Sequence, residues 1–385
     1  MQKRNMTAGI IGATGYTGSE LLRLLSGHPE IGRIFLASTS CRGQRMEDIY
    51  PNFFKLFDSR PASGVLEDPE TVIAVSDIVF GALPSGAGEA YAAACLERGV
   101  SYIDLSADFR FGGDEETYRA WYGGEWLYPD LRRRSVYGLP ELYRETTKAL
   151  AAAGPAVIGN PGCYPTAVIL AAYPALAGKG PHIAAGAAVI ADAVSGVTGA
   201  GREPGRAWHF PECSDSVSPY KVGGHRHTPE ISRNLSVIAG RPVPLVFTPH
   251  LGPYNRGILA TVYLELAEGA VGTETSAGRE ASAVRPKSAE IVEREEVIRR
   301  QYAGFYRDER FVRVLPAGIC AATNRVRQSN YCDISVHLDQ GGRILIVVSA
   351  IDNMVKGAAG QAVQNMNIIA GFDETLGLQA LPALF

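Results

Sequence analysis

Gly12-Ala13-Thr14-Gly15-Tyr16-Thr17-Gly18 is the stretch that decides the fold of the first part of the chain. It follows a short apolar run, residues 8–11, and precedes residues 19–26, whose leucines form a broad apolar face at helical spacing. Glycines in this context let the backbone turn tightly and approach a pyrophosphate, and the helix N-terminus offers unpaired N–H groups to the anion. All seven residues are therefore predicted to bind a dinucleotide, the alternative being a plain glycine-rich turn.

Strand-like and helix-like segments alternate on both sides of this turn and through the first domain. Apolar runs at residues 33–37, 78–83 and 101–105 predict buried strands, and the Ala- and Glu-rich residues 88–98 predict a helix between two of them. Alternation of this kind is typical of right-handed crossovers and a parallel sheet. The sequence therefore predicts an α/β fold that begins with a Rossmann-type domain.

The end of the second predicted strand bears on the choice of cofactor. Enzymes that use NAD usually present Asp or Glu there to the ribose 2′-hydroxyl. Residues 38–42 read Ser-Thr-Ser-Cys-Arg, with hydroxyls and a guanidinium but no carboxylate. Hydroxyl and guanidinium groups suit a 2′-phosphate, so we predict NADP, with Ser38 and Arg42 as contacts. The alternative is that Arg42 is a solvated loop residue.

The alternation of predicted strands and helices ends after Cys163. An apolar helix is predicted over 166–176, a charged surface helix begins at residue 288, and strands are predicted over 182–194, 243–248, 257–266, 331–338 and 343–350. Several of these strands have no helix between them, which favours an α+β domain with a mostly antiparallel sheet. Residues 353–367 are helical again, and we expect them to return to the first domain. The predicted domains are thus 1–162 with 351–385, and 163–350.

Composition and charge exclude some partners. The chain has 385 residues, 46% of them hydrophobic, with a formal net charge of −3, which gives no reason to expect nucleic acid or a membrane as partner. No export signal and no membrane span are expected. The six cysteines are scattered without a CxxC pair, so disulfides and zinc are not expected and a reducing cytoplasm is.

Cys163 is the predicted nucleophile. It lies in the loop-forming stretch Gly159-Asn160-Pro161-Gly162-Cys163-Tyr164-Pro165-Thr166, just before the predicted helix. A thiol near a helix N-terminus lies in a positive electrostatic potential. This potential stabilises the reactive thiolate and the oxyanion that develops during the reaction. The alternative is a buried structural cysteine, a role that better suits the other candidates, Cys41, Cys95, Cys320 and Cys332.

A base should accompany the thiol, and His225 and His227 are the best candidates. They precede Thr228 and Pro229, which read as a helix start with Thr228 as the N-cap. An HxH pair can bind a metal, but a third ligand is not evident, so no metal is predicted. The other histidines are weaker: His209 and His250 remain possible, and His28 and His182 are expected at the surface.

Two arginines are candidates for holding an anionic ligand. Arg202 ends a stretch of small residues, 194–201, and Arg110 ends the segment 104–110. A guanidinium can hold a carboxylate or phosphate with two hydrogen bonds. The alternative for both is a structural salt bridge.

At this point the sequence resembles the N-acetyl-gamma-glutamyl-phosphate reductase family of the semialdehyde dehydrogenase superfamily. The resemblance covers nearly the whole chain, and its most specific blocks are NPGCYPT and HRHTPEI. The blocks occur in this order: GATGYTGSELLRLL (12–25), DLSADFR (104–110), VYGLPE (136–141), NPGCYPT (160–166), SGVTGAGR (195–202), HRHTPEI (225–231), FTPHLGPYNRGI (247–258) and DNMVKGAAGQAVQNMN (352–367).

The resemblance implies a reaction and further site residues. NADPH would reduce an acyl phosphate, N-acetyl-gamma-glutamyl phosphate, to N-acetylglutamate 5-semialdehyde and phosphate in arginine biosynthesis. Cys163 would form a thioester, and a histidine, His225 or as second choice His227, would manage the proton. Residues 163–350 would form a catalytic and oligomerisation domain of a dimer or tetramer. Further contacts would be Pro84, Ser195, Gly196 and Asn353 to the cofactor, and Arg110, Asn160 and Arg202 to the substrate.

One departure and three alternatives accompany this interpretation. Family members often carry His after Leu-Pro where this chain has Ser85, which weakens any catalytic role for that position. A lysine-pathway paralogue acting on a carrier-bound aminoadipyl phosphate would share most motifs. Aspartate-semialdehyde dehydrogenase fits the two specific blocks poorly. A non-catalytic NADP-binding sensor would not need Cys163 on a Pro-Gly loop.

Overall fold

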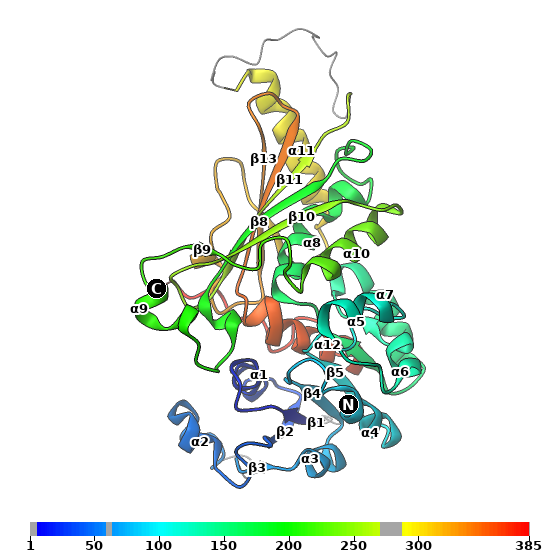
Figure 1. The fold of residues 1–385 in the computed structure, drawn as a ribbon, viewed down its shortest axis with the longest axis vertical. Coiled ribbons are helices and arrows are strands. Elements are labelled where there is room, and N and C mark those ends of the chain that lie inside the picture. The colour runs from blue at the N-terminus through cyan, green and yellow to red at the C-terminus, as the bar shows by residue number, and fades with distance from the viewer. Residues whose placement is uncertain (1–5, 59–63, 270–286, 385) are drawn as a thin grey trace. The chain divides into compact units, whose positions relative to one another are not determined.

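The protein consists of two compact units, shown in a computed structural model that describes residues 6–58, 64–269 and 287–384 (Figure 1). The first unit is drawn from residues 1–162, 200–203 and 354–381. The second is drawn from residues 163–199, 204–353 and 382–385. Cys163 is thus the first residue of the second unit, and the glycine-rich turn lies in the first.

The first unit contains a parallel sheet. In the described residues the strand order is β3-β2-β1-β4-β5-β7-β6, and every neighbouring pair is parallel. The strands are β1 (Met6–Ile11), β2 (Ile31–Ala37), β3 (Leu66–Glu67), β4 (Ile78–Gly81), β5 (Ser101–Asp104), β6 (Val136–Tyr137) and β7 (Val157–Gly159). Strands β1, β4 and β5 are almost wholly buried, which explains their continuous apolar sequences.

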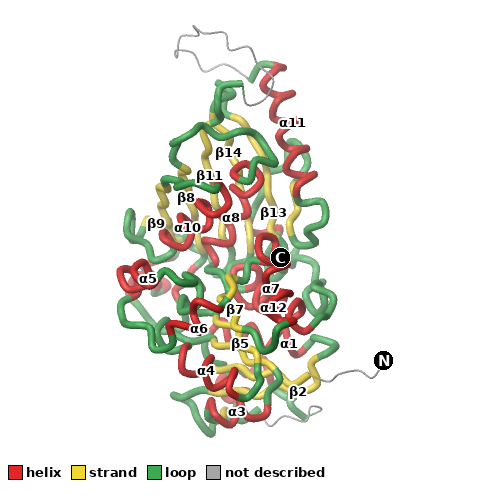
Figure 2. The backbone as a smooth tube through the Cα atoms, turned by 90° about the vertical axis from the view of Figure 1, so that its right-hand side faces the viewer, coloured by secondary structure: helices red, strands yellow, loops and turns green. Residues whose placement is uncertain are grey.

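Helices pack against this sheet in two groups. One group is α1 (Tyr16–Ser26), α7 (Pro140–Ala152) and α12 (Gly360–Ala370), in which α12 contacts both other helices, and Figure 2 shows them together. The other is α3 (Pro69–Val75) and α4 (Glu89–Glu97), which contact β1, β2, β4 and β5. Shorter pieces complete the unit: α2 (Met46–Ile49), η1 (Pro51–Phe53), α5 (Glu115–Tyr122) and α6 (Pro129–Arg134). The predicted Rossmann-type domain is confirmed.

The C-terminal segment is tied into the first unit by buried polar groups. It begins with a π-helical turn, η5 (Val355–Ala359), before α12, where one continuous helix was expected. The Nζ of Lys356, which is fully buried, donates to Glu141 on α7 at 2.6 Å and to Gln364 at 2.9 Å. The amide of Asn365 donates to the carbonyl of Gly138. A buried charge persists only where it is paired in this way.

The second unit contains a mixed sheet. In the described residues the order is β12-β13-β14-β11-β8-β10-β9, with β8/β10 and β12/β13 parallel and the other pairs antiparallel. The predicted mostly antiparallel sheet is confirmed. The strands are β8 (Val189–Ser195), β9 (Ser218–Pro219), β10 (Leu245–Leu251), β11 (Ile258–Glu265), β12 (Val312–Val314), β13 (Cys332–Leu338) and β14 (Ile344–Ile351).

The strand predicted over 182–194 is wrong in its first half. Strand β8 begins only at Val189, and Ile183 makes an isolated bridge with Leu266. The reason is a turn, in which the N–H of Ala187 donates to the carbonyl of Ala184 and Gly186 has a φ of +78°. A left-handed glycine of this kind interrupts a strand.

Three helices cover one face of this second sheet. They are α8 (Cys163–Leu176), against β11 and β14, α10 (Thr228–Ala239), against α8 and β10, and α11 (Ala289–Phe305), against β13 and β12. Ser288 caps α11, since its side chain accepts the N–H of Ile291. Short pieces elsewhere are η2 (Val197–Ala200), η3 (Arg206–Trp208), α9 (Phe210–Cys213) and η4 (Thr323–Arg325). Across the described ranges, every helix is too short or too polar to cross a lipid bilayer.

Candidate active site

The glycines of the turn after β1 differ in whether and why the fold requires glycine at each position. Gly12 has a φ of +83°, and a Cβ there would meet the carbonyl oxygen of Ala82 at 2.3 Å. A Cβ on Gly18 would meet the carbonyl oxygen of Gly12, also at 2.3 Å, so this glycine lets α1 pack onto the turn. At Gly15 the nearest atom is 3.6 Å away, so the protein itself would accept a side chain there. The fold itself therefore gives no steric reason for glycine at position 15.

The N-terminus of α1 fits the pyrophosphate of a dinucleotide. Gly15 is the N-cap, and within the described part of the chain no side chain caps the helix by a hydrogen bond. The first turn also carries no acidic residue. A helix end of this kind presents main-chain N–H groups and a partial positive charge to an anion. The predicted contact of residues 12–18 with a dinucleotide stays a prediction, and the uncapped start of α1 is compatible with it.

The hydroxyls at the end of β2 are clustered, as a 2′-phosphate site would need. The Oγ of Ser38, which is buried, lies 3.2 Å from Oγ1 of Thr14 and 3.4 Å from Oγ of Ser40. Arg42 is exposed, but its guanidinium pairs with the carboxylate of Asp68 at 2.6 Å. The sequence around β2 shows no carboxylate, and the fold supplies one from the residue that precedes α3.

Arg202 lies beside the glycine-rich turn in the first unit. Its Nη1 donates to the carbonyl of Thr14 at 3.0 Å, and its guanidinium lies 5.0 Å from the ring centre of Tyr50. The hydroxyl of Tyr50 donates to the same carbonyl. Arg202 was predicted to bind substrate, and that role stays a prediction, since its contacts here are with the turn.

Asp108 shapes the loop that carries Pro84, and sequence reasoning missed it. Its carboxylate accepts the N–H groups of Gly86 at 2.7 Å and Gly88 at 2.9 Å, and the hydroxyl of Tyr118 at 2.7 Å. Pro84 is exposed in this loop after β4. Asp108 lies within the block DLSADFR, which was the available signal. The loop is therefore held in shape by the segment that follows β5.

Arg110 and Asn160 are held by main-chain carbonyls. Arg110 is buried and donates to the carbonyl of Asn160 at 2.7 Å and to that of Leu105 at 3.0 Å. Asn160 donates to the carbonyl of Ala358 and accepts from Asn365. These bonds fix the end of β7 and the approach to Cys163. Their predicted role in substrate binding stays a prediction.

Cys163 is the first residue of α8, whereas the helix was predicted to begin at Thr166. Pro165 does not prevent the earlier start, because a proline in the first turn has no N–H that the helix needs. The cysteine is partly buried, and the helix behind it is apolar and almost wholly buried. A sulfur at this position is close to the positive end of a helix, which stabilises a thiolate.

His225 lies in an aromatic pocket that includes Tyr164, the residue that follows Cys163. Its ring centre is 5.6 Å from that of Tyr164, the neighbour of Cys163 in sequence, 5.3 Å from that of Tyr220 and 5.6 Å from that of Phe247. Burial, followed by the charges of Lys221 and Arg226, lowers the pKa of His225 to about 4.

The pocket is held by tyrosines that sequence reasoning missed. Tyr220 donates its hydroxyl to that of Tyr164 at 3.2 Å, and Tyr164 donates to the carbonyl of His250 at 2.9 Å. Burial first, and then the nearby thiol of Cys163, raise the pKa of Tyr220 to about 12, although the hydrogen bond with Tyr164 lowers it. Both tyrosines are therefore neutral donors beside the thiol.

His227 is the N-cap of α10, which corrects the prediction for Thr228. Thr228 is the first helical residue, and Pro229 follows within the first turn. The main-chain N–H of His227 donates to Nδ1 of His225 at 3.0 Å, and the two rings are 4.9 Å apart. The structure therefore brings together the two predicted histidines.

Ser195, Gly196 and Asn353 form one hydrogen-bonded corner of the second unit. The side chain of Asn353 accepts the N–H of Gly257 and donates to Thr198. A Cβ on Gly196 would meet the carbonyl oxygen of Asn255 at 2.5 Å. These residues were predicted to contact the cofactor, and that role stays a prediction.

Several weaker expectations need correction. His28 is buried, not exposed, and its Nε2 lies 2.9 Å from the side-chain oxygen of Asn367. Cys320 is exposed and Cys41 is partly buried, so of the four cysteines expected to be structural only Cys95 and Cys332 are buried. Over residues 6–58, 64–269 and 287–384, no cluster of His, Cys, Asp and Glu is placed to hold a metal ion.

The two units correspond to the two domains of the semialdehyde dehydrogenases, which is the class to which this chain belongs. Residues 7–150 match the family model described as semialdehyde dehydrogenase, NAD binding domain. Residues 163–284 and 281–353 match semialdehyde dehydrogenase, dimerisation domain. An aspartate semialdehyde dehydrogenase II from Vibrio cholerae has the same fold, with a TM-score of 0.66 at 16% identity over 95% of this chain and 98% of that one.

Relatives of higher identity define the family. An N-acetyl-gamma-glutamyl-phosphate reductase from Clostridium kluyveri is 45% identical over 98% of this chain and 99% of that protein. One from Moorella thermoacetica is 44% identical over 97% of both. The chain belongs to the N-acetyl-gamma-glutamyl-phosphate reductase family. The family, the oxidoreductase class and the nicotinamide cofactor expected from the sequence are confirmed.

Proposed function

We propose that this chain reduces N-acetyl-gamma-glutamyl phosphate to N-acetylglutamate 5-semialdehyde and phosphate, with NADPH as reductant and Cys163 as nucleophile. The observation that carries the proposal is the position of Cys163 at the first residue of α8, beside the aromatic pocket of His225. Its relatives have the matching name over nearly their whole length. A thiol so placed suits acyl transfer, which needs a thiolate and a donor for the oxyanion.

The residues of the chain would act in sequence. The thiolate of Cys163, stabilised by the start of α8, attacks the acyl carbon, and phosphate leaves to give a thioester. The ring of His225 packs against that of Tyr164, the residue after Cys163, and would act on the reacting oxygen. The nicotinamide, when bound, supplies the hydride that converts the thioester to the aldehyde. Cys163 then returns as thiolate.

The cofactor would bind to the first unit. The turn from Gly12 to Gly18 and the N-terminus of α1 would hold the pyrophosphate. Ser38, Thr14 and Arg42 would hold the 2′-phosphate, which favours NADP over NAD. Arg42 must then exchange part of its ion pair with Asp68 for the phosphate.

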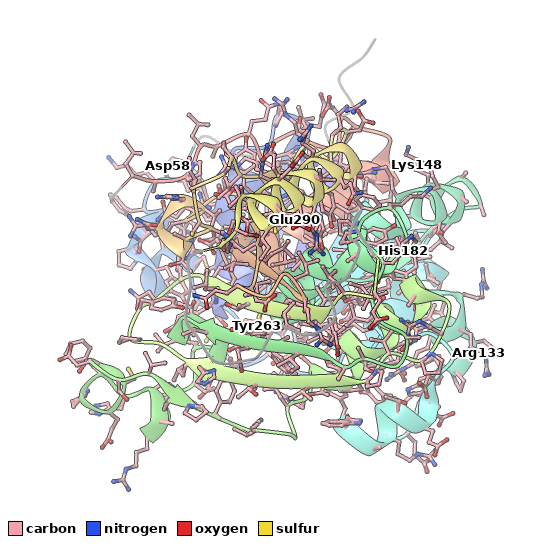
Figure 3. All side chains as sticks on the ribbon, turned by 90° about the horizontal axis from the view of Figure 1, so that it is seen from above. Asp58, Arg133, Lys148, His182, Tyr263 and Glu290 are labelled. Atoms are coloured by element: carbon pink, nitrogen blue, oxygen red, sulfur yellow. The ribbon has the colours of Figure 1, made fainter. Side chains whose placement is uncertain are left out.

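The second unit would also join copies of the chain. Residues Val246, Ile190, Tyr263 and Ile346 are direct cross-strand neighbours on the face of the sheet opposite the buried Phe247, Ala191, Val262 and Val347. Val246 is 52% exposed and Ile190 41% exposed, and Figure 3 labels Tyr263 on this sheet. A row of apolar side chains of this kind is typical of a homo-oligomer interface. Six free thiols suit a reducing compartment, the cytoplasm.

The reverse reaction tests the proposed function. N-acetylglutamate 5-semialdehyde, phosphate and NADP are mixed with the protein, and NADPH formation is followed by absorbance. We expect turnover that requires phosphate and that alkylation of the thiols abolishes. A phosphate-independent reaction, or full activity after Cys163 is alkylated, would contradict the proposal.

A further inference from the structure

The backbone determines which nitrogen of His225 carries the proton. The main-chain N–H of His227 donates to Nδ1 of His225 at 3.0 Å. A ring nitrogen that accepts a hydrogen bond has no proton, so the proton of the neutral ring is on Nε2. A main-chain amide cannot reverse its role and accept. The loop before α10 therefore holds His225 in the Nε2–H form.

The surroundings of His225 also disfavour a positive charge on its ring. The side chain is 8% exposed and is enclosed by Tyr164, Tyr220 and Phe247. The charges that act on it, Lys221 and Arg226, are both positive. Since these repel an imidazolium and the aromatic rings do not solvate one as water does, the neutral ring is favoured.

We propose that His225 acts as a neutral Nε2–H donor to the carbonyl oxygen of the reacting acyl group, and not as the base that removes a proton from Cys163. The proposal rests on the proposed function, and it assigns the direction of one hydrogen bond within it. A base would need the lone pair of Nε2, which the proton occupies in this tautomer. The first turn of α8, where Cys163 lies, is left to stabilise the thiolate.

The chemistry needs a donor at that oxygen and no proton transfer. When the sulfur bonds to the acyl carbon, the π electrons of the carbonyl move to oxygen. They return as the C–O bond to phosphate breaks, and the released phosphate takes a proton from water. The oxygen is negative again once the thioester carbon has accepted a hydride. It becomes the aldehyde oxygen as the C–S bond breaks and its electron pair returns to sulfur. An Nε2–H stabilises both oxyanions.

Nitrogen NMR tests the tautomer directly. Protein labelled with ¹⁵N in its histidines is measured across neutral pH, and the His225 signals are assigned by their loss in His225→Gln. We expect the shifts of a neutral ring with the proton on Nε2. An imidazolium, or a proton on Nδ1, would overturn the proposal. The tautomer is measured on the unmodified protein, and the His225→Gln variant serves only to assign the signals.

A pair of amide variants tests the role. The side-chain amide of Gln reaches the place of Nε2, and that of Asn reaches the place of Nδ1, so only His225→Gln can return an N–H to the oxyanion. We expect kcat to fall by about 10²–10³ in His225→Asn, the usual effect of losing one such donor. In His225→Gln we expect a fall of about tenfold or less. Equal losses in both variants would refute the donor role.

Thiol alkylation separates a donor from a base. The rate at which iodoacetamide modifies Cys163, followed on its peptide by mass spectrometry, is measured against pH in both variants. We expect both variants to show the same pH profile of alkylation as the unmodified protein, because the helix and not His225 stabilises the thiolate. A shift of the profile to higher pH would mean that His225 activates the thiol. His182→Gln, at an exposed histidine labelled in Figure 3, is the matched control.

These readouts are independent of the proposed function. Neither the NMR spectrum nor alkylation involves a substrate. If the protein failed to turn over the acyl phosphate while the tautomer and the alkylation profile were as expected, the substrate would be wrong and the arrangement of His225 correct. If turnover were normal and the alkylation profile shifted, the substrate would be correct and the proposed role of His225 wrong.

Discussion

Arg42 illustrates how a single side chain can be recognised from sequence while its partner cannot. Its place after β2 and the nearby hydroxyls predict a contact with a 2′-phosphate. The structure adds Asp68, 26 positions further along the chain by number, at 2.6 Å from its guanidinium. An exposed ion pair of this kind contributes about 1 kcal/mol or less. A dianionic phosphate can therefore displace it.

The substitution Arg42→Ala should weaken the binding of NADPH and leave the binding of NADH nearly unchanged. Loss of a hydrogen bond between charged groups costs about 1.5–3 kcal/mol, so we expect the KM for NADPH to rise on the order of tenfold or more. Steady-state kinetics with both cofactors measures the difference. Arg98→Ala, at an exposed arginine that donates to the carbonyl of Ala94 in the preceding helix, is the control. Equal changes for both cofactors would remove the 2′-phosphate role.

At the scale of elements, the second sheet has two chemically different faces. Residues of β8, β10, β11 and β14 alternate between buried positions beneath the helices and more exposed positions, and the exposed set includes the apolar Ile190, Val246, Tyr263 and Ile346. Ile190 on β8 and Val246 on β10 are paired in register on the half-exposed face. An apolar surface of this kind is stable in water when a second copy covers it.

A charge on this face should separate the copies. Ile190→Asp would place a carboxylate in the centre of the proposed interface, where a charge without a partner is strongly unfavourable. We expect the mass from light scattering to fall to that of a single chain, with circular dichroism unchanged. Val75→Asp, at a 46% exposed valine of the first unit, should keep the assembly. An Ile190→Asp protein with the mass of the unmodified one would exclude this face.

The extent of prediction differs between the elements. Strands β1, β4 and β5 and helix α11 follow from local patterns, because continuous apolar runs and a Ser cap are visible in the sequence. The start of α8 was predicted three residues late, since Cys163-Tyr164-Pro165 reads locally as a loop. The strand predicted over 182–194 contains a turn at Gly186, which the apolar sequence of this segment does not indicate.

At the scale of the whole molecule, the candidate site depends on tertiary contacts that no local pattern contains. Cys163 and His225 could be named from their motifs, but not the hydrogen bond from His227 that sets the tautomer of His225. Tyr164, Tyr220 and Asp108 were missed because their roles come from partners distant in the sequence. Motifs predict which chemistry is present, and packing determines the protonation state in which it operates.

Detection of the thioester tests the central claim most directly. The protein is mixed with N-acetyl-gamma-glutamyl phosphate without NADPH, quenched in acid and digested, and the mass of the Cys163 peptide is measured. We predict one N-acetylglutamyl group on Cys163, formed with the release of phosphate and discharged to aldehyde when NADPH is added before the quench. Phosphate release with an unmodified Cys163, or an acyl group on another residue, would contradict the account.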